Sequence, residues 1–426
     1  MSRLSYKTLF IILLFLLIPI VFLIRINQKS NKISAAWWNN SWTYRQAISI
    51  SNPSGTELSD FQVSVNIGTS ALIASNKMQS DCDDIRITDI NGNLLPHWIE
   101  ENNPGCNQPT DTKIWLKTNS LPASGTTIYL YYGNQVANNI ESGNDVFLEF
   151  DDFNNSISIS NWIPESNPST TYSIAGGTMS AIISGGDYSS AVFGANYSDI
   201  IVNSRYKVNS SQTHGGFVFR AQTNAADNSY QWVLRRSSSD NRIQKRSGAS
   251  QSYLLGGAAG EILPSTLSPE NWHSVEFRVS GTQVDTYFNN QQAIDGNFLD
   301  TSYSSGKIGL LSYDGTENYD YIFVRKYATS SPSSVPQSEE NRPQGVNIGG
   351  TSIETPPGNL VAYYKFDEGY GSVANNSGSI GSTGNGTLPS STSSPTWIEN
   401  GKIYKGLHFD NNDYISLPNS LGYTNQ

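Results

Sequence analysis

The sequence predicts an all-β protein, with several domains in series behind one apolar N-terminal segment. Apolar residues alternate with polar ones at period two, as from Phe61 to Ile67 and from Val275 to Val279, which is the pattern of half-buried strands. Turn-forming pairs such as Ser280-Gly281 separate these runs. From Trp37 onward we find no twelve-residue stretch with the 3.6-residue spacing of a helix. Strands at this density predict β-sandwiches or jelly rolls rather than βαβ units.

The distribution of charge excludes several classes of function. The chain has 426 residues, of which 15% are charged, and its net charge is −10. Residues 1–35 carry five basic side chains and no acidic one, so the rest of the chain is more acidic still. An acidic body is repelled by phosphate backbones, so we expect no nucleic-acid partner. The two cysteines are too few for a disulfide-dense scaffold or a cysteine zinc ribbon.

Residues 1–36 are expected to direct the chain to a membrane rather than to form part of a domain. Leu9 to Ile24 is a sixteen-residue run that is apolar apart from Pro19. A cleaved signal peptide needs a small-x-small site close to such a run, but the site at Ser34 and Ala36 lies well beyond it. A spanning helix needs about 17–25 residues. We favour an uncleaved signal-anchor over a cleaved peptide, which predicts a single-pass membrane protein with its body outside the cytoplasm.

Composition divides the remaining chain into three domains and a linker. The first domain, residues 37–147, ends where a Tyr-rich strand gives way to the aromatic and acidic segment Phe147–Phe153. The second domain is expected over residues 148–328. Residues 329–358 contain five prolines and many serines, which is typical of a solvated, semi-extended linker. The third domain, residues 359–426, begins with a strand expected at Leu360–Phe366.

Six sequence blocks give the first domain a family resemblance. They are Trp42–Arg45, Asp60–Val63, Asp81–Arg86, Leu95–Glu100, Ile114–Lys117 and Ile128–Asn134. In this order they resemble the domain of unknown function DUF2341. That family has no assigned chemistry and recurs at the head of secreted or membrane-anchored surface proteins, often beside concanavalin-like modules. Some members accompany a proton channel of the biopolymer-transport type, which adds an accessory role to the functions to be considered.

Cys82 and Cys106 are the two cysteines of the chain and lie on either side of a predicted hairpin. In an exported domain they are expected to form a disulfide, worth about 3 kcal/mol on the chain-entropy model. The alternative is a pair of free buried thiols. In the same domain, Trp98 and Trp115 are expected in the core between two sheets rather than on a sugar-binding surface.

The second domain resembles the concanavalin A-like jelly roll of lectins and family-16-type glucanases. The resemblance rests on the hairpin Trp272–Phe288, on Gly306–Leu310 and on Tyr319–Val324. It implies a two-sheet sandwich with one concave face, without implying an activity. The glucanase string Glu-x-Asp-x-x-Glu has its nearest counterpart at Glu149, but Asn154 stands where the last Glu belongs. We therefore expect no catalytic residue and no enzyme.

The second domain contains three candidate residues for a carbohydrate-binding site. Arg220, Tyr230 and Trp232 are the candidates for a sugar platform, in which aromatic faces stack on a sugar ring and the guanidinium binds hydroxyl groups. The alternation along the segment places Tyr230 and Trp232 on one face of a strand. That face must either line a concave groove or enter the core, and we favour the core for Trp232.

The third domain resembles the N-terminal part of a laminin-G-like jelly roll. The resemblance rests on Leu360–Gly369, Lys402–Asp410 and Asp413–Pro418. Such domains are longer than residues 359–426, so we expect a truncated domain. Asp367 and Glu368 are weak candidates for a calcium site, because the ligands that would complete it are expected beyond Gln426. No other cofactor is expected.

These observations predict a membrane-anchored, extracytoplasmic surface protein that serves in adhesion or carbohydrate binding. Its expected partners are the membrane, through the N-terminal helix, and a glycan or other surface polymer. The alternatives are a glycan-active hydrolase of concanavalin-like fold, a structural spacer of an envelope or surface layer, and an accessory protein of a biopolymer-transport channel.

Overall fold

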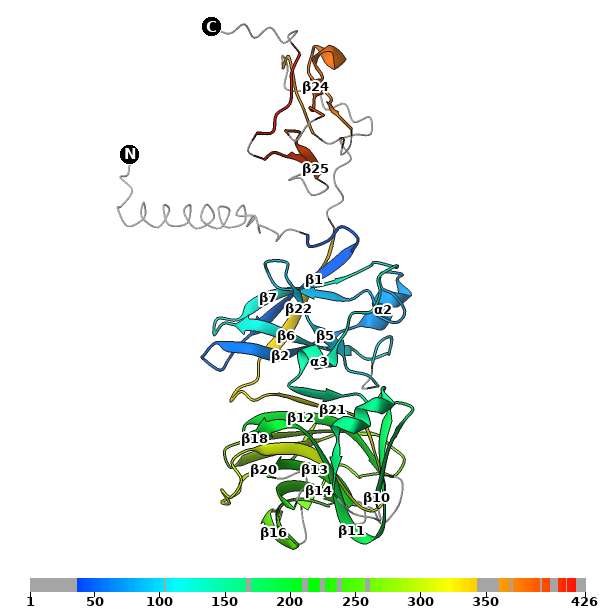
Figure 1. Cartoon of the computed structure of the whole chain (residues 1–426), viewed down its shortest axis with the longest axis vertical. Coiled ribbons are helices and arrows are strands. Elements are labelled where there is room, and N and C mark those ends of the chain that lie inside the picture. Colours follow the sequence, from blue (N-terminus) through cyan, green and yellow to red (C-terminus); the bar gives the residue numbers. More distant parts are fainter. Residues whose placement is uncertain are drawn as a thin grey trace, which may run out of the picture. The chain divides into compact units, whose positions relative to one another are not determined.

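A computed structural model divides the chain into two compact units, residues 1–340 and residues 341–426 (Figure 1). It describes residues 37–102, 105–165, 170–208, 214–222, 227–235, 240–256, 261–342, 360–366, 368, 371–390, 393–398, 405–410 and 412–418. The expected signal-anchor lies outside these ranges, so the transmembrane helix stays a prediction. Within the described ranges, no helix has the length and apolar character needed to cross a membrane.

The first domain is a sandwich of two antiparallel sheets with the orders β22-β1-β7-β3-β4 and β2-β6-β5. Alternate residues such as Ile48, Val63 and Leu116 fill the core between them. The elements are β1 (Tyr44–Ser51), β2 (Leu58–Ile67), α2 (Thr69–Ala74), β3 (Arg86–Thr88), β4 (Leu94–Leu95), β5 (His97–Ile99), β6 (Thr112–Leu121), β7 (Thr126–Tyr132), α3 (Gly143–Val146) and β22 (Ser333–Asn341).

The predicted disulfide between Cys82 and Cys106 is present. Their Cα atoms lie 6.2 Å apart and the two residues are 24 positions apart in sequence. Cys82 is buried and belongs to the core of the first domain. The bond therefore ties a loop of this domain to its core, and the alternative of two free thiols is wrong.

The segment expected to be a linker contributes a strand to the first domain. β22 lies beside β1 at the edge of its sheet, and its yellow ribbon runs among the blue and cyan strands (Figure 1). Ser333 Oγ is 2.7 Å from Ser51 Oγ, and Arg45 Nε donates to Glu340 at 2.8 Å, so the two strands run in opposite directions. The linker prediction for residues 329–358 is therefore wrong for β22. An edge strand pairs on one side only and tolerates proline.

The second domain is the predicted two-sheet jelly roll, and its two long strands pass through both sheets. β11 and β21 pair antiparallel along most of their length. The first part of β21 pairs with β13 and its last part with β12. Between these parts β21 bends at Asp314 and Gly315, whose φ angles are +47° and +158°. The long strands are β11 (Thr178–Tyr197) and β21 (Gly306–Lys326), and the others used here are β12 (Ile200–Val208) and β13 (His214–Ala221).

The strand order across the bend is β16-β15-β14-β13-β21-β12-β18-β19-β20. The hairpin predicted at Ser280-Gly281 joins β18 to β19, which are antiparallel. The remaining elements are β8 (Glu149–Asp151), the 3-10 helix η1 (Ser156–Asn161), β9 (Ile163–Pro164), β10 (Thr170–Ala175), β14 (Asn228–Arg235), β15 (Asp240–Ser247), β16 (Ser250–Leu255), β17 (Glu261–Ile262), β18 (His273–Ser280), β19 (Gln283–Phe288) and β20 (Gln291–Asn297). The prediction of an all-β chain is thus confirmed for the described residues.

Aromatic side chains join the first two domains into one unit. Trp98 and Trp115 are buried, but they do not lie between the sheets of the first domain as expected. They pack instead with Phe147, Tyr321 and Phe323 at the boundary with the second domain. The ring centroids of Trp115 and Phe323 are 5.4 Å apart. The sheet β2-β6-β5 therefore packs one face against its own domain and places Trp98 and Trp115 of the other face against the jelly roll.

The second unit contains short antiparallel pairs. β23 (Val373–Ala374) pairs with β24 (Gly386–Thr387), and β25 (Thr396–Ile398) pairs with β26 (Gly406–His408); the 3-10 helix η2 spans Gly381–Gly384. Of the calcium candidates, Glu368 accepts a 2.7 Å hydrogen bond from the Asn375 amide, and Asp367 lies outside the described residues. In the described ranges, no three His, Cys, Asp or Glu side chains are grouped as a metal site would need.

Candidate functional site

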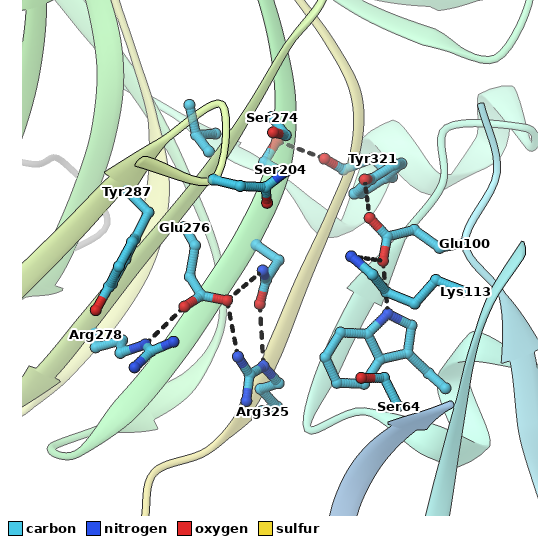
Figure 2. A pocket seen from close by; sticks show the side chains of 14 residues that line it. Ser64, Glu100, Lys113, Ser204, Ser274, Glu276, Arg278, Tyr287, Tyr321 and Arg325 are labelled. Carbon is cyan, nitrogen blue, oxygen red and sulfur yellow. Dashed lines mark hydrogen bonds and ion pairs between the residues drawn. The ribbon is translucent and has the colours of Figure 1, made fainter. Parts of the chain in front are cut away.

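A polar cleft of about 310 Å³ lies between the first and second domains (Figure 2). Its size falls at the lower end of the range for small-ligand pockets. The wall from the first domain consists of Ser64, Glu100, Lys113 and Trp115. The wall from the jelly roll consists of Asn203, Ser204, Ser274, Val275, Glu276, Arg278, Tyr287, Asn290, Tyr321 and Arg325.

Strand alternation explains why charged groups line the wall of the jelly roll. On β18, Val275, Phe277 and Val279 are buried in the core of the sandwich. The intervening Glu276 and Arg278 therefore stand on the outer face of the sheet, because successive side chains point to opposite faces. Arg325 alternates in the same way with core residues of β21. The first domain covers this outer face, so the charges lie in a cleft rather than on an open surface.

Glu276 is the centre of the network on this wall. Its Oε1 accepts a 2.6 Å hydrogen bond from Arg278 Nε. Its Oε2 accepts 2.8 Å hydrogen bonds from Arg325 Nη2 and from Asn203 Nδ2. Asn203 Oδ1 in turn accepts from Arg325 Nε at 3.1 Å. The bidentate use of Arg325 fixes the orientation of both Glu276 and Asn203.

The electrostatics of this network keep Glu276 ionised. Burial by itself would raise the pKa of Glu276, but the guanidinium groups of Arg325 and Arg278 outweigh it and hold that pKa below its ordinary value. Burial lowers the pKa of Arg325, against the attraction of Glu276. For Arg278, burial likewise lowers the pKa, but the neighbouring carboxylate outweighs it and the net shift is upward. At neutral pH the three groups form a charged triad with a net charge of about +1.

Glu100 organises the opposite wall. Its Oε2 accepts a 2.8 Å hydrogen bond from Trp115 Nε1 and lies 3.3 Å from Lys113 Nζ. Its Oε1 accepts a 2.6 Å hydrogen bond from the Tyr321 hydroxyl, which belongs to the jelly roll. Figure 2 shows Glu100 and Lys113 facing Glu276 across the cleft. The Glu100–Tyr321 bond thus connects the two domains where the cleft begins.

The character of Glu276 does not suit it to the role of a general acid. Glycoside hydrolysis needs a carboxylic acid that is protonated near neutral pH beside a second carboxylate. Glu276 has the opposite character, because the pKa of its carboxyl group lies below the ordinary value. Arg278 and Lys113, by contrast, keep donors available, since each side chain is 29% exposed. The cleft therefore offers fixed cationic donors to a ligand.

The sugar platform predicted from Arg220, Tyr230 and Trp232 is wrong. Tyr230 and Trp232 are 0% exposed, and Arg220 is 5% exposed. The Trp232 ring packs in the core, with its centroid 6.3 Å from that of Phe277. Arg220 Nη1 donates to the carbonyl of Gly281 at 2.8 Å. The shared face of β14 enters the core, which is the outcome favoured for Trp232, and Arg220 holds loops together.

Glu149 has a structural position. Its Oε1 accepts hydrogen bonds from the Ala195 amide at 2.8 Å and from the Tyr197 hydroxyl at 2.6 Å. β8, which carries Glu149, pairs with β21 at the start of the domain. Glu149 therefore fixes the first strand of the jelly roll to β11, where Ala195 and Tyr197 lie.

The sequence did not predict the cleft, although the strand pattern did place two of its residues on an outer sheet face. Glu276 and Arg278 alternate with apolar residues, which placed them on an outer face. The alternation carries no information about Lys113 and Glu100, which approach that face from a domain more than 100 residues away in sequence. Only the packing of one domain on the other brings the two sets together.

Two family models match the chain. Residues 81–165 match the domain of unknown function DUF2341, so the resemblance of the first domain is confirmed over residues 81–147, and the match continues into the start of the second domain. Residues 150–325 match the 3-keto-alpha-glucoside-1,2-lyase-like domain, which covers almost all of the jelly roll. The laminin-G resemblance of residues 359–426 stays a prediction.

Solved structures similar to the chain include three of bacterial origin. A carbohydrate-binding module from Bacillus subtilis is 17% identical, with 39% of this chain and 96% of that one covered and a TM-score of 0.33. A protein of unknown function with a galectin-like fold, also from Bacillus subtilis, is 12% identical, with 42% and 96% covered and a TM-score of 0.35. A family-16 glycoside hydrolase from Bacteroides ovatus is 11% identical, with 42% and 99% covered and a TM-score of 0.31. No curated protein matches the sequence. The comparisons therefore establish two matches, one to DUF2341 over residues 81–165 and one to the lyase-like domain over residues 150–325.

Proposed function

We propose that this protein is held in the membrane with its body outside the cytoplasm, and that it binds carbohydrate in the cleft between its first two domains. The observation that carries the proposal is the cleft itself, about 310 Å³ in volume and lined by guanidinium, ammonium, amide and hydroxyl groups. Sites for polar ligands place a few such groups around an aromatic surface. Tyr287, which is partly exposed, supplies an aromatic ring at the edge of this cleft.

Two further observations support the proposal. The jelly roll matches a family model named for a lyase of a glucoside, so a sugar is the ligand class to test first. The Cys82–Cys106 disulfide favours an oxidising compartment, since disulfides persist outside the cytosol. Together with the apolar run Leu9–Ile24, it favours an anchored, exported protein.

The binding test uses the full-length protein, solubilised in detergent, on an array of neutral and acidic glycans. Arg278→Ala should lose the binding that the unmodified protein shows. Lys207→Ala is the matched control, because Lys207 lies on the same sheet face, 3.8 Å from Glu270, and does not line the cleft. Absence of glycan binding by the unmodified protein would refute the proposal. Equal binding by Arg278→Ala would place the ligand elsewhere.

The anchor has its own test. N-terminal sequencing of the protein recovered from membranes should give the residues that precede Leu9. A first residue at Trp37 would show instead that the segment is cleaved after the small-x-small site at Ser34 and Ala36.

A second candidate function is enzymatic, because the matched family is named for lyase activity. The protein would then cleave a glycosidic bond of the sugar it binds. Release of reducing ends or unsaturated products from mixed polysaccharides is the assay, and no release by the unmodified protein would leave binding as the function.

A further inference from the structure

We infer that the ligand of the cleft is an anionic sugar, with a carboxylate or sulfate group that Arg278 and Lys113 bind from opposite walls. The inference rests on the proposed function, carbohydrate binding in this cleft, and names the class of sugar. The cleft leaves more cationic hydrogen-bond donors than carboxylate acceptors available to a ligand.

The acceptors of the cleft are largely occupied by the protein. Glu276 accepts from Arg278, Arg325 and Asn203. Glu100 accepts from Trp115 and Tyr321 and is paired with Lys113. A carboxylate has about four lone-pair positions, so each retains little capacity for a new donor. The hydroxyl protons of a neutral sugar would therefore find few free carboxylate acceptors here.

The donors are in surplus. Arg278 uses Nε for Glu276, and no hydrogen bond from its two Nη groups occurs among the described residues. Lys113 carries three protons, and among the described residues its ion pair is with Glu100, at 3.3 Å. Both side chains are 29% exposed, so they can reach a ligand without leaving their partners. Unused cationic donors beside occupied carboxylates select a ligand that brings its own negative charge.

The local charge agrees with this selection. Three cationic and two acidic side chains line the cleft, so it is positive by about one charge, whereas the whole chain has a net charge of −10. Asp285, which also faces Arg278, is hydrogen-bonded by Gln283 at 2.7 Å and does not line the cleft. An excess of one positive charge in the cleft of an otherwise acidic protein favours an anionic ligand over a neutral one.

Two contacts fix the orientation of the Arg278 side chain. Its guanidinium lies 4.6 Å from the centroid of the Tyr287 ring, and Glu276 fixes its Nε. These contacts limit the rotation of the side chain, so a planar carboxylate meets a guanidinium that is already oriented. Lys113 approaches from the first domain, so each wall of the cleft presents a cationic donor.

The test measures binding of four probes to the full-length protein in detergent by calorimetry. They are an oligogalacturonate, its methyl ester, a sulfated galactan oligosaccharide and a neutral cello-oligosaccharide. We expect at least one anionic probe to bind tenfold or more tightly than the methyl ester and the neutral probe. Preference for the oligogalacturonate identifies a uronate ligand, and preference for the sulfated probe identifies a sulfated one; both outcomes support the inference.

The variants Arg278→Gln and Lys113→Gln should each weaken the anionic probe about tenfold, while Lys207→Gln leaves it unchanged. Should a variant fail to fold, the salt dependence of the unmodified protein decides, because affinity should fall severalfold from 50 to 500 mM NaCl. Equal binding of the acid and its methyl ester overturns the inference but leaves carbohydrate binding standing. Absence of binding to all four probes overturns both.

Discussion

Glu317 should make the stability of the jelly roll fall as the pH rises. It lies on β21 just beyond the bend and is 0% exposed. Neither of its carboxyl oxygens has a hydrogen-bond partner among the described residues. The pocket around it is tight, since a Cβ added at Gly215 would lie 2.2 Å from the Tyr206 hydroxyl and 2.8 Å from Glu317 Cγ. Burial favours the neutral acid and raises the pKa of Glu317 well above its ordinary value of 4.5, although the neighbouring Ser312 hydroxyl and Tyr313 backbone act in the opposite direction.

The sign of the effect follows from proton binding. Between pH 4.5 and the raised pKa, the folded protein keeps the proton of Glu317 while the unfolded chain has lost it. Unfolding then releases a proton, so this group reduces the free energy of unfolding by about 1.4 kcal/mol for each pH unit in that window.

The assay is urea unfolding of the full-length protein at pH 5, 6, 7 and 8. Glu317→Gln keeps the size of the side chain and removes its titration. Its stability relative to the unmodified protein should therefore rise with each step of pH. Parallel pH profiles for the two proteins would refute the reasoning.

Glu276→Gln is the matched control and should behave in the opposite way. The pKa of Glu276 is held below its ordinary value by Arg325 and Arg278, although burial opposes them. Its stabilising contribution is thus present above pH 4.5 and is lost as the pH falls through the lowered pKa. The variant should be less stable than the unmodified protein at pH 7, and the difference should shrink in acid. A difference that does not shrink below pH 4 would contradict this assignment.

Three further perturbations test the packing. Replacing Cys82 and Cys106 by Ala removes a cross-link between residues 24 positions apart, and the chain-entropy relation gives a loss of about 3.5 kcal/mol in the free energy of unfolding; an unchanged urea midpoint would contradict it. Trp232→Ala empties a fully buried position and should lose about 3–5 kcal/mol of stability, while the folded variant keeps the glycan affinity of the cleft; reduced affinity in the folded variant would contradict the assignment of the site to the cleft. Trp98→Ala opens a cavity between the first two domains and should lose a similar amount, and calorimetry should then resolve two transitions where the unmodified pair of domains gives one. A single transition in the variant would mean that other contacts couple the domains.

Local pattern was enough to predict the strands and the faces they present. The alternation from Val275 to Val279 predicted a strand with one buried face, and β18 has that face in the core. The turn pair Ser280-Gly281 predicted the hairpin that joins β18 to β19. Both predictions succeed because residues that are adjacent in sequence determine which face of a strand is buried.

The cleft could not be predicted in the same way, because its walls belong to different domains. Trp98 and Trp115 have the pattern of core residues, and pattern does not say which core they enter. They pack on Phe323 of the jelly roll rather than between the sheets of their own domain. This contact covers the outer face that carries Glu276. The cleft is thus a consequence of how two complete domains pack, which the alternation within a single strand does not predict.

β22 shows why composition misplaces a domain boundary. A stretch rich in Pro and Ser lacks large apolar side chains, and composition therefore classes it with linkers. An edge strand needs few such side chains, since its backbone pairs with one neighbour and charged groups on it discourage further pairing. Arg45 donates to Glu340 at 2.8 Å and lies over the Trp37 ring, 4.7 Å from its centroid. The guanidinium of Arg45 therefore contacts both Trp37, near the start of the first domain, and Glu340, at the end of β22. The compact unit formed by the first two domains accordingly ends at Glu340 rather than near residue 328.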